Sequence, residues 1–400
     1  MMNKIIVVAL LFGCTTPSLG QFIIPIQGKQ NIDWFLVNYV DRDSSIGSIR
    51  DYKCNKLTYD GHQGTDFVLR DFRQMDSGVS VYAAKSGKVY FTTDGKFDRS
   101  KQADTGGYGN FISINHGDSL YTIYAHLRKF SLLVNIGDSV YQGQSIATVA
   151  SSGKAEDPHL HFEVWNHGFI VDPFGEHCPL ELAVPGMFNQ PPPYENDFSV
   201  ISDGILGSKV TLDSIREHPS DETSLRILSD SVISYWIHGL SIHLGDSVRI
   251  DWKTPSNTVW YTYSYHWDNN HRYWYLWTYI DGPRLQKSMP PGKWRVEFYL
   301  NDSLRSDHQF SIPTLTAAQS DIEEIMIYPT VCVDNFIVRS KEKVDEIRLC
   351  NVVGQLYPVS VSMMPLGATA YWESLPSGMY IASVKTRSLV QKNFRVCICR

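Results

Sequence analysis

The chain has 400 residues, of which 43% are apolar, and this is more than one ordinary hydrophobic core needs. We therefore expect two to four domains. The net charge of −6 and the lack of a long basic run in the sequence argue against nucleic acid as a partner.

The first twenty residues have the pattern of a secretory signal peptide. A charged start with Lys4 precedes the apolar run 5–11, and small and polar residues follow up to Gly20. The apolar run is too short to span a bilayer as a helix. We therefore predict an exported protein with a signal peptide at residues 1–20. The alternative is an N-terminal anchor, because residues 11–14 loosely resemble a lipoprotein cleavage site.

The rest of the chain divides into segments of different pattern. Residues 21–50 form an N-terminal segment that could cover a cleft. In residues 51–182, short β-branched runs alternate with Gly, Asn and Asp turns, as in all-β domains. The proline-rich stretch 183–196 is typical of a stiff linker. Two more β patterns follow, an immunoglobulin-like β-sandwich at 197–315 and a third β domain at 322–400. The predicted fold class is all-β.

The stretch PHLHFEV, residues 158–164, places two imidazoles in a strand that otherwise reads as buried. Residues i and i+2 of a strand point to one face, so His159, His161 and Glu163 share a face and apolar residues occupy the other. Neutral imidazole is a common zinc ligand, so the pair indicates the start of a metal site. Glu163 could orient a ligand from behind. The alternative is a carboxylate that is solvated or bonded within a turn.

The segment GHQGTDF offers an imidazole, His62, and a carboxylate, Asp66, four residues apart. On a straight strand the two would lie too far apart for one ion, so we expect Gly64 to bend the backbone and bring them together. One histidine of the pair His159 and His161 would complete three ligands. Three protein ligands with an open fourth position are the arrangement of a catalytic zinc.

A third histidine motif is YTIYAHL, in which His126 ends an alternating strand. If the sheet brings His126 beside His159, two imidazoles that are not metal ligands would flank the water at the metal and could move protons to and from it. We expect His116 to be structural. Asn110 could line the cleft, but an ordinary turn residue is the favoured interpretation.

These motifs resemble those of the lysostaphin-type, or LytM-type, zinc metallopeptidases of bacterial cell walls. The matching segments keep the order GHQGTDF, GGYGNFISINHG, YTIYAHL, VNIGDSVYQGQSIATV and PHLHFEVWNHG. The resemblance implies one Zn²⁺ held by His62, Asp66 and His161. It implies His126 and His159 as the unliganded catalytic pair, on an antiparallel β-sheet domain.

The resemblance covers roughly Tyr52 to Pro173 and implies a function. Members of the family cleave peptide cross-links of peptidoglycan. Zinc would polarise the scissile carbonyl and lower the pKa of its water towards about 7. One of the two free histidines would take the proton, and both could stabilise the oxyanion and reprotonate the leaving amine.

The alternative function is a catalytically inactive wall-binding or amidase-activating protein on the same fold. Degenerate relatives lose metal or catalytic histidines, whereas all five residues are present here, which favours the enzyme. Two details depart from the family pattern: the polar insert at residues 92–106 and the pair Glu156-Asp157 before the proline. We expect both at the rim of the cleft, where they would affect substrate preference.

Seven cysteines suit an exported protein. Cys54 and Cys178 bracket the segment that carries the chemistry, so we expect them to pair. The sequence has no CxxC repeat of zinc-finger spacing, which argues against a cysteine metal site.

Residues 259–280 are rich in aromatic side chains and are predicted to form a hairpin around Asp268. The favoured interpretation is that the rings make cross-strand pairs inside the sandwich. The alternative is that the stripe stacks on sugar rings of a glycan.

The segment from about Ile322 onward contains IMIYPT, VDEIRLCNVVGQLY and LPSGMYIASVKT. These segments resemble the C-terminal sorting domain of type IX secretion in Bacteroidetes. The resemblance implies the type IX secretion machinery as a partner, and a protein that is secreted or attached to the outer cell surface. The alternative is a third, adhesive β-sandwich.

Overall fold

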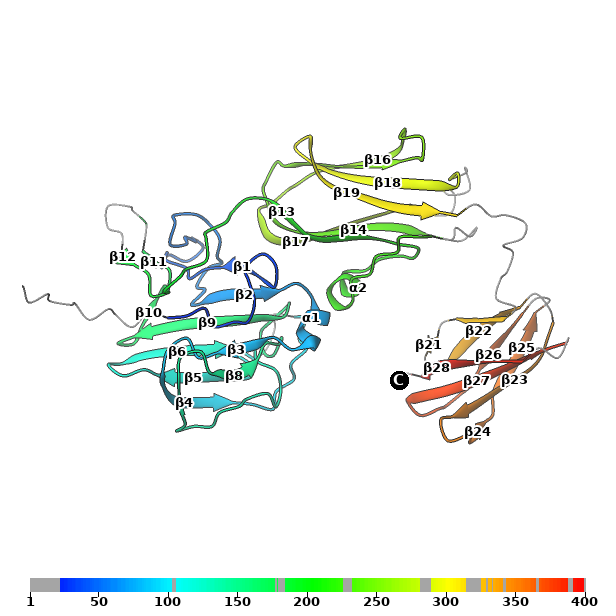
Figure 1. The fold of residues 1–400 in the computed structure, drawn as a ribbon, viewed down its shortest axis with the longest axis horizontal. Helices are drawn as coiled ribbons and strands as arrows, with labels where there is room; N and C mark the ends of the chain where they lie inside the picture. The colour runs from blue at the N-terminus through cyan, green and yellow to red at the C-terminus, as the bar shows by residue number, and fades with distance from the viewer. Residues whose placement is uncertain are drawn as a thin grey trace, which may run out of the picture. The chain divides into compact units, whose positions relative to one another are not determined.

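The computed structural model describes residues 22–400 except 103–105, 177, 179–183, 226–231, 281–288, 314–324, 329, 333, 341–342, 365–366, 388–390 and 399–400. The predicted signal peptide, residues 1–20, lies outside the described residues. The chain divides into two compact units, residues 1–313 and residues 314–400. Strands dominate both units, which confirms the predicted all-β class (Figure 1).

The described residues contain two short helices, α1 (Phe72–Ser77) and α2 (Leu212–Glu217). Each has six residues, and in the described part of the chain neither is long and apolar enough to cross a membrane.

The first sheet has eight strands in the order β1-β2-β9-β6-β5-β4-β7, with β10 paired to β9. Its strands are β1 (Trp34–Asn38), β2 (Thr65–Leu69), β4 (Gly87–Thr93), β5 (Phe111–Asn115), β6 (Leu120–Ala125), β7 (Ser139–Val140), β9 (His159–Asn166) and β10 (Phe169–Val171). Two smaller sheets accompany it, β3 (Ser80–Tyr82) with β8 (Ser145–Thr148), and β11 (Gly175–Glu176) with β12 (Val184–Pro185).

Strand β9 shows the expected alternation. Leu160, Phe162 and Val164 are fully buried in the hydrophobic core of this domain. His161 and Glu163 point to the opposite face, where they line a cavity. The period of two predicted from the sequence is therefore confirmed, and the two polar rings lie on the face away from the core.

The N-terminal segment contributes a strand to this sheet. Strand β1 pairs antiparallel with β2, and Trp34 and Leu36 of β1 belong to the domain core. The sheet thus begins before residue 51, where the sequence analysis starts the domain. The pairing joins the segment to the sheet edge beside the candidate site.

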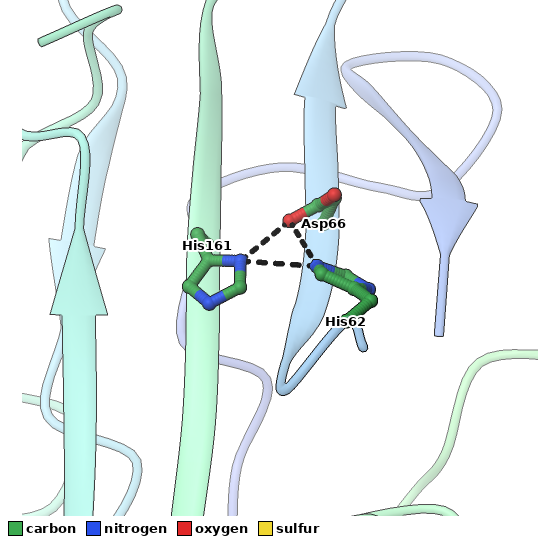
Figure 2. A group of neighbouring side chains, drawn as sticks. All are labelled: His62, Asp66 and His161. Atoms are coloured by element: carbon green, nitrogen blue, oxygen red, sulfur yellow. Dashed lines mark hydrogen bonds and ion pairs between the residues drawn. The ribbon is translucent and has the colours of Figure 1, made fainter. Parts of the chain in front are cut away.

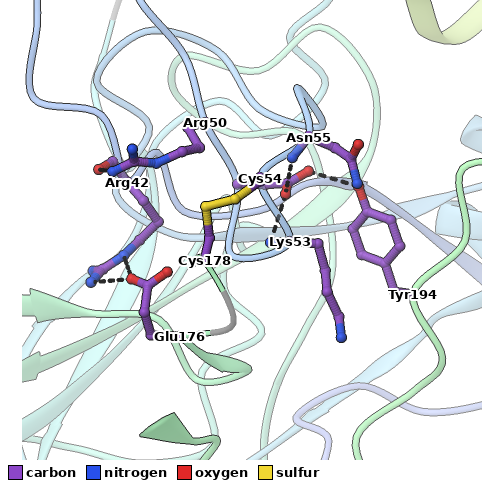
Figure 3. Close-up of a disulfide and its surroundings, with 9 residues drawn as sticks. Arg42, Arg50, Lys53, Cys54, Asn55, Glu176, Cys178 and Tyr194 are labelled. Atoms are coloured by element: carbon purple, nitrogen blue, oxygen red, sulfur yellow. Dashed lines mark hydrogen bonds and ion pairs between the residues drawn. A yellow bond between two sulfur atoms is a disulfide. The ribbon is translucent and has the colours of Figure 1, made fainter. Parts of the chain in front are cut away.

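A disulfide joins Cys54 to Cys178, with Cα atoms 5.4 Å apart, so the expected pairing is confirmed (Figure 3). Next to it, buried Asp51 accepts hydrogen bonds from the backbone N–H of Asn55 and from the hydroxyl of Tyr194. Together the covalent link and the carboxylate hold the loop between β1 and β2 against the segment that follows β11.

A β-sandwich follows, with sheets of order β13-β14-β17 and β16-β15-β18-β19. Its strands are β13 (Ser199–Leu206), β14 (Ile233–Ile242), β15 (Ser247–Lys253), β16 (Val259–His266), β17 (His271–Ile280), β18 (Gly292–Leu300) and β19 (Ser303–Ile312). Large rings fill the core between the sheets, among them Trp252, Trp294 and Phe298.

The prediction that residues 259–280 form an aromatic hairpin is wrong. Strand β16 pairs with β15, whereas β17 pairs with β14, so the chain crosses from one sheet to the other between them. Trp267 and Trp274 are both buried in the core beside this crossing. Alternating aromatic residues fit either pairing, and burial of these two rings between the sheets favours the crossing.

The aromatic residues of this segment have two different environments. Tyr261, Tyr263 and Tyr265 of β16 are partly buried against the sandwich core, as in the favoured interpretation. Tyr273 and Tyr275 of β17 instead form hydrogen bonds with residues of the first domain.

The sandwich packs directly on the first domain. Phe35 and Val37 of β1 and Val68 of β2 form a buried cluster with Leu240 of β14. All ten residues of β14 are buried: some lie in the core of the sandwich, Leu240 lies in this cluster, and Trp236 packs with Val210 and Ile215. The two domains therefore share a hydrophobic contact next to the sheet edge.

The C-terminal unit is a second β-sandwich, with sheets of order β20-β22-β26-β25 and β21-β28-β27-β23-β24. Its strands are β20 (Ile325–Tyr328), β21 (Val331–Cys332), β22 (Asn335–Ser340), β23 (Val344–Asn351), β24 (Leu356–Tyr357), β25 (Ser360–Met364), β26 (Gly367–Tyr371), β27 (Gly378–Thr386) and β28 (Gln391–Ile398). The unit has its own buried core, which includes Phe336, Leu349 and Val384.

We predict that replacing both Cys54 and Cys178 by Ser destabilises the first domain. The bond closes a loop with a sequence separation of 124, and a link of this kind contributes about 2–4 kcal/mol, mainly by restricting the unfolded chain. Thermal and denaturant unfolding of the full chain would measure the loss. The control is Cys350→Ser, because that cysteine forms no disulfide. Equal stability of the double variant and this control would contradict the prediction.

Candidate metal centre

The register of the central strands brings the predicted ligands together. Asp66 of β2 lies directly opposite His161 of β9, and on the other side of β9 His161 lies opposite Ala125 of β6. His62 precedes β2 in a loop and is buried, as are Asp66 and His161. Two segments far apart in the sequence, residues 62–66 and strand β9, therefore bring the three predicted ligands to one point of the sheet.

The three side chains form a compact triangle (Figure 2). Asp66 Oδ1 lies 3.2 Å from His62 Nε2 and 2.8 Å from His161 Nδ1, and the two ring nitrogens are 3.2 Å apart. A tetrahedral zinc with bonds of about 2.0–2.1 Å separates its ligand atoms by roughly 3.3 Å. The donor set and its spacing therefore fit one face of a zinc coordination tetrahedron.

A second layer of contacts turns each ligand atom towards the centre. The ring nitrogen His62 Nδ1 lies 2.7 Å from the carbonyl oxygen of Tyr39, which can only accept, so Nδ1 carries the proton and Nε2 is left with its lone pair. Asn38 donates to the outer oxygen of Asp66 at 2.8 Å. Such outer partners fix the tautomer and orientation of metal ligands.

Glu163 performs the same task for His161. The carboxylate is 1% exposed, and His161 Nε2 lies 2.9 Å from its Oε1, so Nε2 donates and Nδ1 faces the centre. Tyr108 and Trp165 also donate to Glu163. Burial raises the pKa of Tyr108, which keeps its hydroxyl a neutral donor. The structure thus favours the orienting role of Glu163 over a solvated carboxylate.

His126 and His159 lie beside the triangle. Their ring centroids are 4.5 Å apart, and His159 Nε2 is 3.7 Å from Asp66 Oδ1. Nδ1 of His126 donates to the carbonyl of Ser152, and Nδ1 of His159 donates to the carbonyl of Asp157. In both rings Nε2 is therefore the unprotonated nitrogen. Burial lowers the pKa of both imidazoles, so the neutral, proton-accepting form prevails at pH 7.

The backbone around the site has two special positions. The chain bends at Gly64, as expected, and His62 and Asp66 converge, although the backbone of Gly64 is not left-handed. A Cβ at this position would lie 2.7 Å from the ring of His161, so the glycine is required for space. His126 has a φ of 61°, a left-handed conformation that is costly for a non-glycine residue and clusters at functional sites.

Two adjoining cavities open onto the site. One of about 260 Å³ is lined by His62, His161 and Glu163, together with Tyr108. The other, about 480 Å³, is lined by Asp66 and His159 and extends to the sandwich. Tyr59, His126 and Lys154 line both cavities. The candidate site therefore lies in a cleft that a substrate chain can enter.

Several residues of the site carry no sequence signal of their own. Asn38 and Tyr59 precede the recognisable motifs, and the ring of Tyr59 lies 4.4 Å from that of His62.

Asn110 is fully buried and bonds to the backbone of Lys96 and Leu127, so it braces two loops and does not line the cleft. Only the three-dimensional pairing shows these roles.

Comparison with known proteins gives the family of this domain. Residues 60–173 match the family model described as Peptidase family M23. The chain contains an M23 peptidase domain. The matched range includes all five predicted site residues, from His62 to His161.

Several known proteins are similar to the M23 domain. The peptidoglycan DD-endopeptidase ShyA of Vibrio cholerae is 32% identical over 124 residues, which are 31% of this chain and 25% of that protein. The DD-carboxypeptidase/endopeptidase Mpg of Neisseria gonorrhoeae is 33% identical over 106 residues, 26% of this chain and 23% of that protein. A solved structure of a zinc containing peptidase from Vibrio cholerae is 30% identical and covers 35% of this chain and 39% of that chain, with a TM-score of 0.23. The chain spans about a quarter of the length of these curated relatives.

Both departures of the M23 domain from the motif pattern lie against the sandwich. In the insert, Arg99 and Lys101 form ion pairs with Glu217 of α2. Asp157 forms an ion pair with Arg216 of the same helix. Asp157 lines the larger cavity, as expected of the rim, whereas the described residues of the insert line neither cavity.

We predict that Glu163→Gln weakens zinc binding about 10–100-fold, the usual cost of losing an outer-layer partner of a ligand. The amide is a poorer acceptor for His161 Nε2–H and lowers the basicity of Nδ1. Competition titration with a chromophoric zinc chelator would measure the affinity. Glu156→Gln is the control, because Glu156 lines the same cleft and its side chain is 60% exposed. Unchanged affinity in Glu163→Gln would show that the contact does not tune the ligand.

Proposed function

We propose that this chain is an exported zinc metalloendopeptidase that hydrolyses peptide cross-links of bacterial peptidoglycan. The observation that carries the proposal is the triangle of His62 Nε2, Asp66 Oδ1 and His161 Nδ1 with two neutral imidazoles beside it. Three protein ligands with space for a fourth are typical of catalytic zinc, whereas structural zinc sites are closed by four protein ligands.

The residues of this chain divide the chemistry between them. A zinc ion held by the triangle supplies Lewis acidity that polarises a scissile carbonyl and lowers the pKa of water. His126 and His159 both present an unprotonated Nε2, so either can take a proton from the attacking water and return it to the leaving amine. Before it passes the proton to the leaving amine, the one imidazole that has taken it would donate a hydrogen bond to the developing oxyanion.

The competing function is a non-catalytic binding or activating protein on the same fold. Such a protein has no need to keep two free imidazoles next to the ligand triangle. Here the left-handed backbone of His126 and the carbonyl partners of His126 and His159 keep both rings directed at the site. This arrangement favours catalysis.

Peptidoglycan as the substrate is supported by the similarity of the M23 domain to ShyA, a peptidoglycan DD-endopeptidase by its name. The open cleft fits a peptide chain, because the cavities on both sides of the triangle leave room for residues on either side of the scissile bond. The zinc requirement is supported by the donor set.

Export and the role of the C-terminal unit rest on the sequence. The charged start and short apolar run of residues 1–20 support a signal peptide. The sorting-domain motifs fall in the unit 314–400, which has its own core and is compact by itself. We propose that this unit is the type IX secretion signal, and that the protein is secreted or attached at the outer cell surface.

We predict that the purified chain releases peptide ends from isolated sacculi, and that a chelator abolishes the release while added zinc restores it. Fragments identified by mass spectrometry would name the bond. Asp66→Ala should lose both zinc and activity. His126→Ala should keep zinc and lose about 10²–10⁴-fold in rate, the usual contribution of a general acid or base.

The matched control is His167→Asn, an exposed histidine of the same domain that lies outside the ligand triangle; Asn tolerates its left-handed backbone. Intact sacculi with the zinc-loaded chain would contradict the proposed enzyme and leave the binding role. Chelator-resistant cleavage would contradict the metal mechanism.

A further inference from the structure

The sandwich domain contacts the loop that precedes the strand of His159. Arg216 of α2 donates through Nη2 to Asp157 Oδ2 at 2.9 Å, and its Nε lies 2.9 Å from Asp157 Oδ1. The hydroxyl of Tyr275 on β17 lies 3.4 Å from the same carboxylate, and its ring stacks on His238. Arg216 and Asp157 are mostly buried, with side chains 11% and 14% exposed.

Asp157 in turn fixes His159. Its backbone carbonyl accepts a hydrogen bond from His159 Nδ1 at 2.8 Å, which directs Nε2 towards Asp66 and the ligand triangle. The backbone N–H of His159 donates to the carbonyl of Ala150. A continuous chain of contacts therefore leads from Arg216 through both ends of Asp157 to the free imidazole.

The same sandwich residues face the cleft. The cavity of about 480 Å³ beside His159 is lined on one side by Asp66, Lys154 and Asp157 and on the other by Arg216 and Tyr275. A substrate chain entering here contacts both domains. The residues that hold the loop are thus the residues that wall the cleft.

Docking of the two domains does not depend on Arg216 alone. On the same helix, Glu217 forms ion pairs with Arg99 and Lys101, away from the cavity. The apolar cluster of Phe35, Val37 and Leu240 adds a further contact. Removing the Arg216 contact should therefore leave the domains together, which allows the two roles to be separated.

We propose that the sandwich domain is part of the active site, and that Arg216 is a positioning residue that holds His159 in its catalytic orientation through Asp157. The proposal deepens the proposed function and rests on it. It predicts that the M23 domain of this chain needs residues 197–313 for turnover, in addition to any effect of these residues on its stability.

The test compares Arg216→Met with Glu217→Gln in the full chain. Both substitutions remove an interdomain ion pair of α2, but only Arg216→Met removes a contact with the loop that precedes His159. With a soluble cross-linked muropeptide dimer as probe, Arg216→Met should lower kcat about 10–100-fold, the scale of a displaced catalytic group. Glu217→Gln should stay within about twofold, and zinc affinity should be the same in both within about twofold, because neither residue touches a ligand. Arg216→Lys should recover only part of the rate, since an ammonium cannot match the planar fork.

A second readout does not depend on activity. Hydrogen exchange of the backbone amides in residues 155–160, followed by mass spectrometry, should rise in Arg216→Met and stay at the level of the unmodified chain in Glu217→Gln. If Arg216→Met does not fold, Asp157→Asn is judged by the same two measurements, because it keeps the backbone carbonyl and weakens the ion pair. Equal kcat and equal exchange in the two α2 variants would overturn the proposal. If the unmodified chain cleaves no muropeptide, the proposed function fails, while the exchange measurement still decides whether Arg216 holds the loop.

Discussion

The antiparallel register of β2 against β9 is the constraint on which the metal centre depends. It sets Asp66 opposite His161, and because side chains alternate along a strand, a slip of one residue would turn Asp66 into the apolar core. The register is secured by that same core: Phe67 of β2 and Leu160 and Phe162 of β9 are fully buried on the other face. Packing on one side of the sheet thus fixes the position of the ligands on the other.

Each of the four imidazoles of the site has a defined hydrogen-bond partner before any substrate arrives. Backbone carbonyls accept hydrogen bonds from the Nδ1–H groups of His62, His126 and His159, and Glu163 accepts one from Nε2–H of His161. A buried imidazole without such a partner would lose solvation and gain nothing in return. These contacts therefore stabilise the fold and select the tautomers needed for metal binding and proton transfer at the same time.

Some of this could be predicted from the sequence, and the rest could not, for physical reasons. The alternation in PHLHFEV gives the two faces of β9, since the period of a strand is a local property. The bend at Gly64 was also expected, but the close approach of the His161 ring, which leaves no space for a Cβ there, comes from a residue 97 positions away in the chain.

Long-range pairing decided the other differences. The joining of β1 to the sheet, the crossing between β16 and β17, and the contact of Arg216 with Asp157 all connect distant segments whose local patterns fit more than one partner. The two departures from the family pattern are the insert at residues 92–106 and the pair Glu156-Asp157. The sandwich domain explains both, because both contact its helix α2.

The most direct test of the account is the coordination of the bound metal. X-ray absorption at the zinc edge of the loaded full chain should show one zinc per chain with two imidazole nitrogens and carboxylate or water oxygens at about 2.0–2.1 Å, and Asp66→Ala should remove the signal. A sulfur ligand at about 2.3 Å, or full zinc occupancy in Asp66→Ala, would contradict it, because the metal would then lie outside the triangle that the β2–β9 register builds.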